Sequence, residues 1–243
     1  MRPPGFEPGS LARKASVLPL DYGRALKLNR IRVIIFFMKR AIAFMALLFL
    51  FVGCIGGSRT IKEPKPAVSE CKVAIILANG FKDVEYSKTR EVLEKAGVDV
   101  VTFGLSREVV GMDGLKVKVD YPISNLNVSG FDAIVLPGGD PGYKNLKNDE
   151  RVINAIKEAY DQDKVVAAIC ASPTVLAEAG ILKNKKATVW SSLTNKDLIK
   201  EIEDAGAIYV DEEVVRDGKI ITANGPQAAE KFANEILNAL GKC

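Results

Sequence analysis

Patterns typical of buried strands and of helices alternate along the chain from residue 72 onward. Short, almost continuously apolar runs predict strands buried on both faces, and the segments between them predict helices. This alternation predicts an α/β fold, a doubly wound and mostly parallel sheet with helices on both faces. The predicted strands are 72–78, 98–103, 131–136, 165–169, 187–190 and 208–210, and the predicted helices are 83–96, 150–161, 197–205, 226–240 and one beginning near Pro173.

Two Asp-Gly pairs predict antiparallel hairpins in addition to the parallel strands. Residues 108–119 alternate between apolar and polar positions around the pair at 113–114, and residues 214–222 surround a second pair at 217–218. Asp-Gly suits tight hairpin turns because its backbone tolerates positive φ. We therefore expect a hairpin at each pair.

The sharpest junction lies where strand 165–169 meets the helix that follows. Cys170 ends the strand, and Pro173 suits the first turn of a helix, where a missing N–H costs nothing. Such a nucleophile elbow lifts the residue at the bend above the carboxyl edge of the sheet. There the helix N-terminus stabilises a thiolate and lowers the thiol pKa. The position favours a reactive cysteine, and an inert core cysteine is the alternative.

Two further turns are expected at the same edge of the sheet. Glu85 lies in the first turn of helix 83–96, where it either shares a proton with Cys170 or only interacts with the helix dipole. Gly138 and Gly139 follow strand 131–136. Their N–H groups could hold an oxyanion or the oxygens of an oxidised sulfur, unless the pair only forms a tight turn.

The composition excludes several kinds of site. The chain has no histidine, so neither a Cys-His catalytic pair nor a His-based zinc site can form. The four cysteines are far apart in sequence, and the turn at 79–82 matches neither a dinucleotide-binding motif nor a P-loop. We therefore expect no metal and no cofactor. Beyond residue 37 the chain carries 27 basic and 28 acidic residues without a basic cluster, which argues against nucleic-acid binding.

The N-terminal region predicts export. Residues 38–54 combine a basic start, an apolar run and a small residue before Cys54, as in a lipoprotein signal peptide. Cys54 would then carry a lipid that tethers the protein to the outer face of the cell membrane, and an ordinary signal or anchor helix is the alternative. We interpret residues 1–37 as a mis-annotated, unstructured extension, 55–70 as a flexible tether and 71–243 as the folded domain.

Two further cysteines flank the predicted domain. Cys71 precedes its first strand, and Cys243 is the last residue of the sequence. In an exported protein these two could form a disulfide and leave Cys170 free. Two unpaired cysteines are the alternative.

Several stretches together resemble the DJ-1/ThiJ/PfpI superfamily, which is related to the class I glutamine amidotransferase fold. The resemblance implies a flavodoxin-like sandwich, usually dimeric or larger, and a nucleophilic, oxidation-prone Cys170 that is hydrogen-bonded to Glu85. It also implies that the backbone amides of Gly139 and Ala171 face this cysteine. The matching residues are Val73–Leu77, Asp83–Glu85, Val135–Gly142, Ala168–Thr174, Lys186–Trp190 and Thr222–Pro226.

Members of the superfamily act as cofactor-free glyoxalases, deglycases, peptidases, redox sensors or chaperones. The chain departs from the family pattern at three positions: Ala171 replaces the histidine of the peptidases, Trp190 replaces a histidine or tyrosine, and Ser172 replaces a glycine. These departures disfavour a PfpI-type cysteine peptidase.

Our functional hypothesis is a glyoxalase- or deglycase-like activity. Cys170 would attack a small reactive carbonyl compound and Glu85 would transfer protons, inside a pocket formed by Trp190, Ser191 and Asn224. A non-enzymatic cysteine redox sensor and a binding module are the alternatives.

Overall fold

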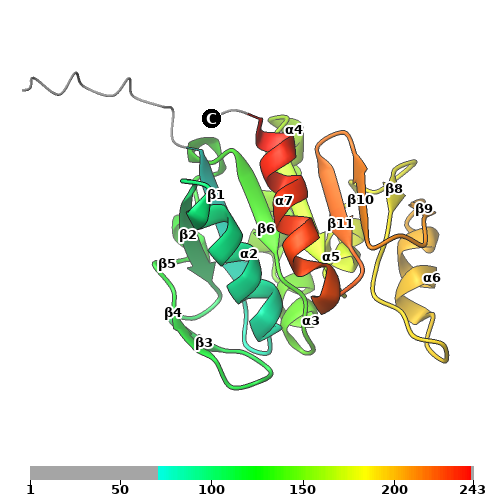
Figure 1. Ribbon diagram of the computed structural model, residues 1–243, viewed down its shortest axis with the longest axis horizontal. Helices are drawn as coiled ribbons and strands as arrows, with labels where there is room; N and C mark the ends of the chain where they lie inside the picture. Colours follow the sequence, from blue (N-terminus) through cyan, green and yellow to red (C-terminus); the bar gives the residue numbers. More distant parts are fainter. Residues whose placement is uncertain (1–70, 242–243) are drawn as a thin grey trace, which may run out of the picture. The chain divides into compact units, whose positions relative to one another are not determined.

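A seven-stranded sheet forms the centre of the computed structural model, which describes residues 71–241 (Figure 1). All neighbouring strands in this sheet run parallel except the pair β10 and β11. The doubly wound, mostly parallel α/β fold is therefore confirmed. In spatial order the strands are β10 (Val214–Asp217), β11 (Ile220–Ala223), β7 (Val165–Ile169), β6 (Ala133–Leu136), β1 (Lys72–Leu77), β2 (Asp99–Gly104) and β5 (Tyr121–Pro122).

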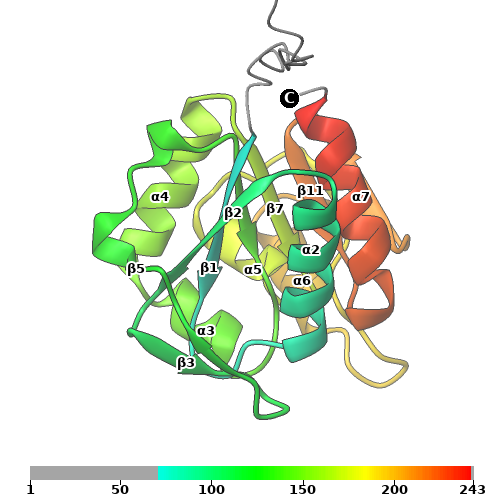
Figure 2. The same cartoon turned by 60° about the vertical axis from the view of Figure 1, so that its left-hand side comes forward.

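Helices cover both faces of the sheet (Figures 1 and 2). The helices α2 (Asp83–Lys95) and α7 (Ala229–Leu240) pack against each other on one face. The other face carries α3 (Gly142–Lys147), α4 (Glu150–Asp161), α5 (Pro173–Glu178) and α6 (Asp197–Asp204). Single 3₁₀ turns lie at Ile123–Asn125, Val128–Gly130 and Pro226–Ala228.

Successive side chains of the central strands fill two separate cores. In β1, Val73, Ile75 and Leu77 pack on the side of α2 and α7, whereas Ala74 and Ile76 pack on the side of α3–α6. All five side chains are fully buried. Burial of each large aliphatic side chain contributes about 1.5–3 kcal/mol to folding. The two-sided cores explain why these strands are apolar at nearly every position.

Both predicted hairpins are present. The strands β3 (Glu108–Val110) and β4 (Lys116–Lys118) pair antiparallel, and β10 pairs antiparallel with β11 around a turn at Gly218. The turn of the β3–β4 hairpin is attached to the start of α2. There the carboxylate of Asp83 accepts hydrogen bonds from the amides of Asp113 and Leu115 at 2.9 and 2.6 Å.

The predicted strand 187–190 is shorter than expected. Only β8 (Lys186–Ala187) is extended and paired, with β9 (Ile208–Tyr209), in a separate two-stranded sheet. Beyond it the backbone turns toward the main sheet, because the amide of Thr188 donates to Oγ1 of Thr222 at 2.9 Å. The amide of Trp190 donates to the carbonyl of Cys170 at 2.8 Å. The helix α3 and the two-residue strand β5 lack a periodic pattern and were not predicted.

Several predictions concern residues outside the described range 71–241. These are the extension 1–37, the signal peptide 38–54 with its lipid anchor at Cys54, and the tether 55–70. Among the described helices, none combines the length and apolar character needed to cross a membrane. Cys71 is disulfide-bonded. Its partner lies outside the described residues, so the pairing with Cys243 stays a prediction.

Candidate functional site

Three adjacent strands bring the predicted reactive residues to one edge of the sheet. The strand β6 lies between β7 and β1, with Leu136 opposite Ala168 and Val135 opposite Ile75. The carboxyl ends of these parallel strands lead into the cysteine elbow, the Gly-Gly turn and the start of α2. The topology therefore brings Cys170, Gly138 and Glu85 together, as expected for a doubly wound sheet.

The backbone at Cys170 is held in an unusual conformation. Its φ is +64°, in the left-handed region that costs a non-glycine residue about 1–3 kcal/mol. Hydrogen bonds hold it in place, because its amide donates to the carbonyl of Ala223 at 2.8 Å and its carbonyl accepts from Trp190. The buried hydroxyl of Ser172 donates to the carbonyl of Pro137 at 2.7 Å and thereby ties the elbow to the neighbouring turn.

The two glycines after β6 allow a very close approach of three chain segments. A Cβ atom on Gly138 would lie 2.5 Å from Cβ of Cys170 and 2.9 Å from Oε2 of Glu85. Gly139 has a φ of +103°, and a Cβ atom there would lie 2.4 Å from the carbonyl oxygen of Gly80. Neither position can accept a side chain without displacing the backbone around it.

The carboxyl group of Glu85 is completely buried beside Cys170. Its Oε2 accepts a hydrogen bond from the amide of Gly138 at 2.7 Å, and the carboxyl group is also hydrogen-bonded to the thiol of Cys170. Burial raises the pKa of Glu85 to about 7, although these two hydrogen bonds and the charge of Lys82 act in the opposite direction. The carboxyl group is therefore partly protonated near neutral pH.

The amide of Gly138 does not have the predicted role. We expected it to face the cysteine as an oxyanion donor, but it donates to Glu85 instead. The reason is that a buried carboxyl group needs a hydrogen-bond donor, and the amide of Gly138 lies within hydrogen-bonding distance of it. The amides of Gly139 and Ala171 do form hydrogen bonds with the sulfur of Cys170, in the positions implied by the resemblance.

The thiol of Cys170 does not have the lowered pKa expected from the elbow alone. Burial raises its pKa, and the charge of Glu85 raises it further, while the amides of Ala171 and Gly139 act in the opposite direction. The helix α5 has only six residues, so its dipole offers limited help. Protonation of Glu85 removes the repulsive charge, so that burial alone opposes the thiolate that the two amides favour. Because the two groups interact, they titrate as a pair.

A pocket of about 530 Å³ opens onto the sulfur of Cys170. Trp190 lines it, as predicted, but Ser191 and Asn224 do not. The side chain of Ser191 is hydrogen-bonded to Tyr209, and the side-chain oxygen of Asn224 accepts from Gln227 at 3.1 Å. The lining residues are Lys82, Met112, Gly139, Asp140, Tyr143, Lys144, Cys170, Ala171, Trp190, Asn195, Asp197, Leu198 and Pro226.

Two lysines in this pocket were not predicted. Lys82 forms an ion pair with Asp113 at 2.9 Å, and Lys144 forms one with Asp140 at 2.8 Å. The hydrogen bond to Asp113 raises the pKa of Lys82, so this side chain is a permanent cation and not a base. Lys82 has an extended backbone and immediately precedes α2, whose first turn carries Glu85. Its place next to this turn is the signal that could have revealed Lys82.

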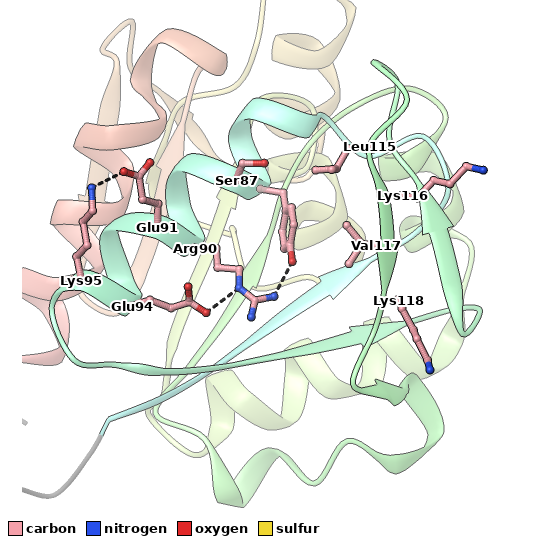
Figure 3. A pocket seen from close by; sticks show the side chains of 10 residues that line it. Ser87, Arg90, Glu91, Glu94, Lys95, Leu115, Lys116, Val117 and Lys118 are labelled. Atoms are coloured by element: carbon pink, nitrogen blue, oxygen red, sulfur yellow. Dashed lines mark hydrogen bonds and ion pairs between the residues drawn. The ribbon is translucent and has the colours of Figure 1, made fainter.

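A second hollow, of about 750 Å³, lies between α2 and β4 and does not include Cys170 (Figure 3). Ion pairs and hydrogen bonds within α2 line it: Arg90 bonds to Glu94 at 2.7 Å and to the hydroxyl of Tyr86 at 2.8 Å. No thiol or buried carboxyl group faces it. The pocket at Cys170 is therefore the candidate active site. Within residues 71–241 no group of three or more acidic or thiol side chains is arranged to hold a metal ion.

Comparison with known proteins identifies the family. The model of the DJ-1/PfpI family matches residues 71–239. A protein of Methanocaldococcus jannaschii is 39% identical over 208 residues, which cover 84% of this chain and 98% of the relative. YraA of Bacillus subtilis, provisionally named a cysteine protease, is 40% identical over 172 residues, 70% of this chain and 98% of the relative. The chain belongs to the DJ-1/PfpI family.

Solved structures agree with this assignment. Drosophila melanogaster DJ-1beta has a TM-score of 0.65 and 30% identity, covering 72% of this chain and 92% of its own. A cysteine-to-alanine mutant of a DJ-1 superfamily protein from Salmonella typhimurium has a TM-score of 0.64 and 31% identity, covering 71% of this chain and 91% of its own. These relatives share the flavodoxin-like sandwich, and their names assign no activity to the present chain.

The charge of Lys82 should control the protonation of the Cys170–Glu85 pair. Replacement of this residue in Lys82→Met removes a cation that favours loss of the first of the pair's two protons, so the midpoint pH for alkylation of Cys170 by iodoacetamide should rise. Lys144→Met is the matched control, because Lys144 lines the same pocket but does not act on the pKa of Glu85. Equal midpoints in Lys82→Met and the unmodified protein would contradict the assigned role.

The raised pKa of Glu85 should make folding stability depend on pH. A carboxyl group whose pKa rises from 4.5 to about 7 on folding stabilises the folded state below pH 4.5, and this stability is lost as the pH rises through 7. The loss is on the order of 3 kcal/mol. Urea denaturation at pH 4.5 and 8 should show this loss in the unmodified protein and a much flatter dependence in Glu85→Gln. Parallel pH dependences would refute the assignment.

Proposed function

We propose that this protein is a cofactor-free enzyme that converts small reactive carbonyl compounds, 2-oxoaldehydes in particular, into 2-hydroxy acids. The observation that carries the proposal is the contact between the thiol of Cys170 and the buried carboxyl group of Glu85. A nucleophile and an acid/base group with a pKa near the working pH are the two components such a reaction requires. Cys170 lines an accessible pocket, and Glu85 lies buried directly behind it.

The first step forms a covalent adduct. The thiolate of Cys170 attacks the aldehyde carbon, a C–S bond forms, and the electron pair of the carbonyl bond moves to oxygen. Protonated Glu85 delivers its proton to this oxygen and yields a hemithioacetal. The amides of Gly139 and Ala171, which are hydrogen-bonded to the sulfur, lie close enough to stabilise the oxygen while it is negatively charged.

The second step moves a proton between two carbons. The carboxylate of Glu85 removes the proton from the carbon bonded to sulfur, and the electrons form an enediolate whose negative charge lies on the neighbouring oxygen. Glu85 then returns the proton to the neighbouring carbon, while the hydroxyl proton of the first carbon moves to the oxygen of the second. The product is a thioester of a 2-hydroxy acid. Water then cleaves the C–S bond, which releases the acid and restores the thiol. The net reaction consumes one water and needs no oxidant or reductant.

This cycle does not require a histidine. Glu85 carries every proton transfer, and Lys82 supplies a positive charge at the pocket wall to balance the anionic pair. The name of YraA points to proteolysis in that relative. Peptide hydrolysis demands protonation of a poor amine leaving group, which Cys-His pairs achieve through the imidazole. The absence of histidine in this chain therefore favours carbonyl chemistry over peptidase activity.

A second candidate function is regulated oxidation of Cys170. The two amides at the sulfur and the carboxyl group of Glu85 together form a set of hydrogen-bonding groups that could hold the oxygens of a sulfinic acid. A DJ-1 protein of Toxoplasma gondii, 28% identical with a TM-score of 0.64, has a solved structure described as oxidized. In this role the protein would be a redox sensor without turnover.

Consumption of methylglyoxal by the purified protein tests the enzymatic proposal. Cys170→Ala should abolish turnover and Glu85→Gln should lower it at least a hundredfold, because the first removes the nucleophile and the second the proton carrier. Glu94→Gln, on the exposed face of the same helix, is the matched control and should retain full activity. Turnover that persists in Cys170→Ala would refute the mechanism. An inactive unmodified protein whose Cys170 is selectively oxidised by peroxide would favour the redox role.

We also propose that the protein is exported and held at the outer face of the membrane through a lipid on Cys54. The sequence pattern of residues 38–54 supports this, and so does the disulfide at Cys71, because disulfides persist chiefly outside the cytosol. Cys54→Ser should move the protein from the membrane fraction to the soluble fraction in cell fractionation. Cys170→Ser serves as the control and should stay with the membrane. Unchanged membrane association of Cys54→Ser would rule out the lipid anchor.

A further inference from the structure

The pocket at Cys170 is much larger than a three-carbon oxoaldehyde. Its volume of about 530 Å³ lies within the range of about 300–1,000 Å³ that is typical of pockets enclosing a whole drug-sized ligand. A compound of three carbons bonded to the sulfur would leave most of this space to water. The pocket is therefore shaped for a substrate with an additional group beyond the reacting carbonyl.

Part of the pocket wall is apolar and aromatic, and it lies among the charged residues: the Asp140 amide donates to the sulfur of Met112 at 3.3 Å, and the ammonium group of Lys144 lies over the ring of Tyr143. Trp190 is 37% exposed although it is the largest apolar side chain in the chain, and Met112 is 50% exposed. Tyr143, Leu198 and Pro226 complete this wall. Large exposed apolar side chains that gather in a pocket become buried when a ligand binds, and this burial contributes to affinity.

The position of Trp190 is fixed relative to the reactive sulfur. Its amide donates to the carbonyl of Cys170 at 2.8 Å, so the tryptophan and the elbow cannot move independently. Gly225, with a φ of +150°, lies beside the indole, and a Cβ atom there would be 3.4 Å from Cδ1 of Trp190. The main chain of Trp190 is thus tied directly to the elbow that carries the nucleophile, and its indole lies in the wall of the same pocket.

The charges around the pocket do not favour an anionic ligand. The lining includes two lysines and two aspartates, and each lysine already forms an ion pair, Lys82 with Asp113 and Lys144 with Asp140. A carboxylate or phosphate on the substrate would have to compete with these aspartates for the lysines and would also lie in a pocket lined by Asp197, so its binding carries an electrostatic cost. An uncharged group meets no such cost.

We propose that the substrate is an uncharged carbonyl compound bearing a ring-sized apolar group, and that this group lies against Trp190 while the carbonyl carbon meets Cys170. The inference rests on the proposed function of the same site and specifies its substrate class. Trp190 is then a specificity-determining residue. Aryl or cyclic alkyl 2-oxoaldehydes are the representatives of this class, and small aliphatic 2-oxoaldehydes are poor substrates.

The test compares phenylglyoxal with methylglyoxal in the full-length protein. The ratio of the two kcat/KM values should be at least about tenfold in favour of phenylglyoxal, the discrimination that a group of this kind gains in an apolar pocket. Trp190→Ala should reduce that ratio to near unity, and Trp190→Phe should restore most of it. Tyr160→Ala is the matched control, because Tyr160 is 38% exposed but does not line this pocket. An equal ratio in Trp190→Ala and the unmodified protein overturns the proposal.

A binding measurement separates this inference from the proposed reaction. Trp190 is the only tryptophan in the sequence, so its emission reports on this pocket alone. In Cys170→Ala, which forms no adduct, acetophenone should change the emission saturably, acetone should not, and benzoate should bind at least tenfold more weakly than acetophenone. This result supports the substrate class even if neither aldehyde is turned over. No saturable change with acetophenone, or tighter binding of benzoate, overturns it.

Discussion

The site depends on the close approach of two acidic side chains across the backbone of Gly138. Cys170 follows β7 and Glu85 lies on α2, which follows β1, and these two strands are not neighbours because β6 lies between them. The turn after β6 must therefore pass between them, and only a residue without a side chain leaves room for the thiol and the carboxyl group to share a proton. The amide of Gly138 also donates to Oε2 of the buried carboxyl group, whereas its Oε1 has no hydrogen-bond partner within residues 71–241.

The same constraint explains where the chain stores strain. A left-handed backbone at Cys170 and an unfavourable buried carboxyl group at Glu85 both reduce stability, and both persist because rigid elements surround them. The strands beneath the site are fully buried on both faces, so the sheet edge cannot relax without opening a core. Ser172 adds a direct tie between the elbow and the turn after β6. The packing of the two hydrophobic cores thus holds Cys170 and Glu85 in their unfavourable arrangement at the carboxyl edge of the sheet.

The sequence was sufficient to predict those parts of the site that depend only on the order of the elements and on which strands are parallel. Apolar runs identified the parallel strands, and parallel strands deliver their following turns to one edge, so the meeting of Cys170, Glu85 and the Gly-Gly turn could be predicted. The direction of an individual N–H group could not be predicted from the sequence. The amide of Gly138 was expected to face Cys170, but it donates to Glu85. The pocket wall depends on the path of loops after β8 and in the β3–β4 hairpin, which explains why Met112 and Asn195 line the pocket and the predicted Ser191 and Asn224 do not.

Without histidine, nucleophile and base are coupled through a single proton, and this coupling imposes an order on the proposed reaction. The thiolate is available only while Glu85 holds the proton, because an ionised Glu85 raises the pKa of the thiol. Once sulfur bonds to carbon its negative charge disappears, and Glu85 loses the neighbour that opposed its own ionisation. Glu85 then becomes a better donor to the new alkoxide and afterwards the base for the adjacent carbon. Attack thus changes the role of Glu85: before it, the carboxyl group holds the proton removed from the thiol, and after it, the same group acts as general acid and then as general base.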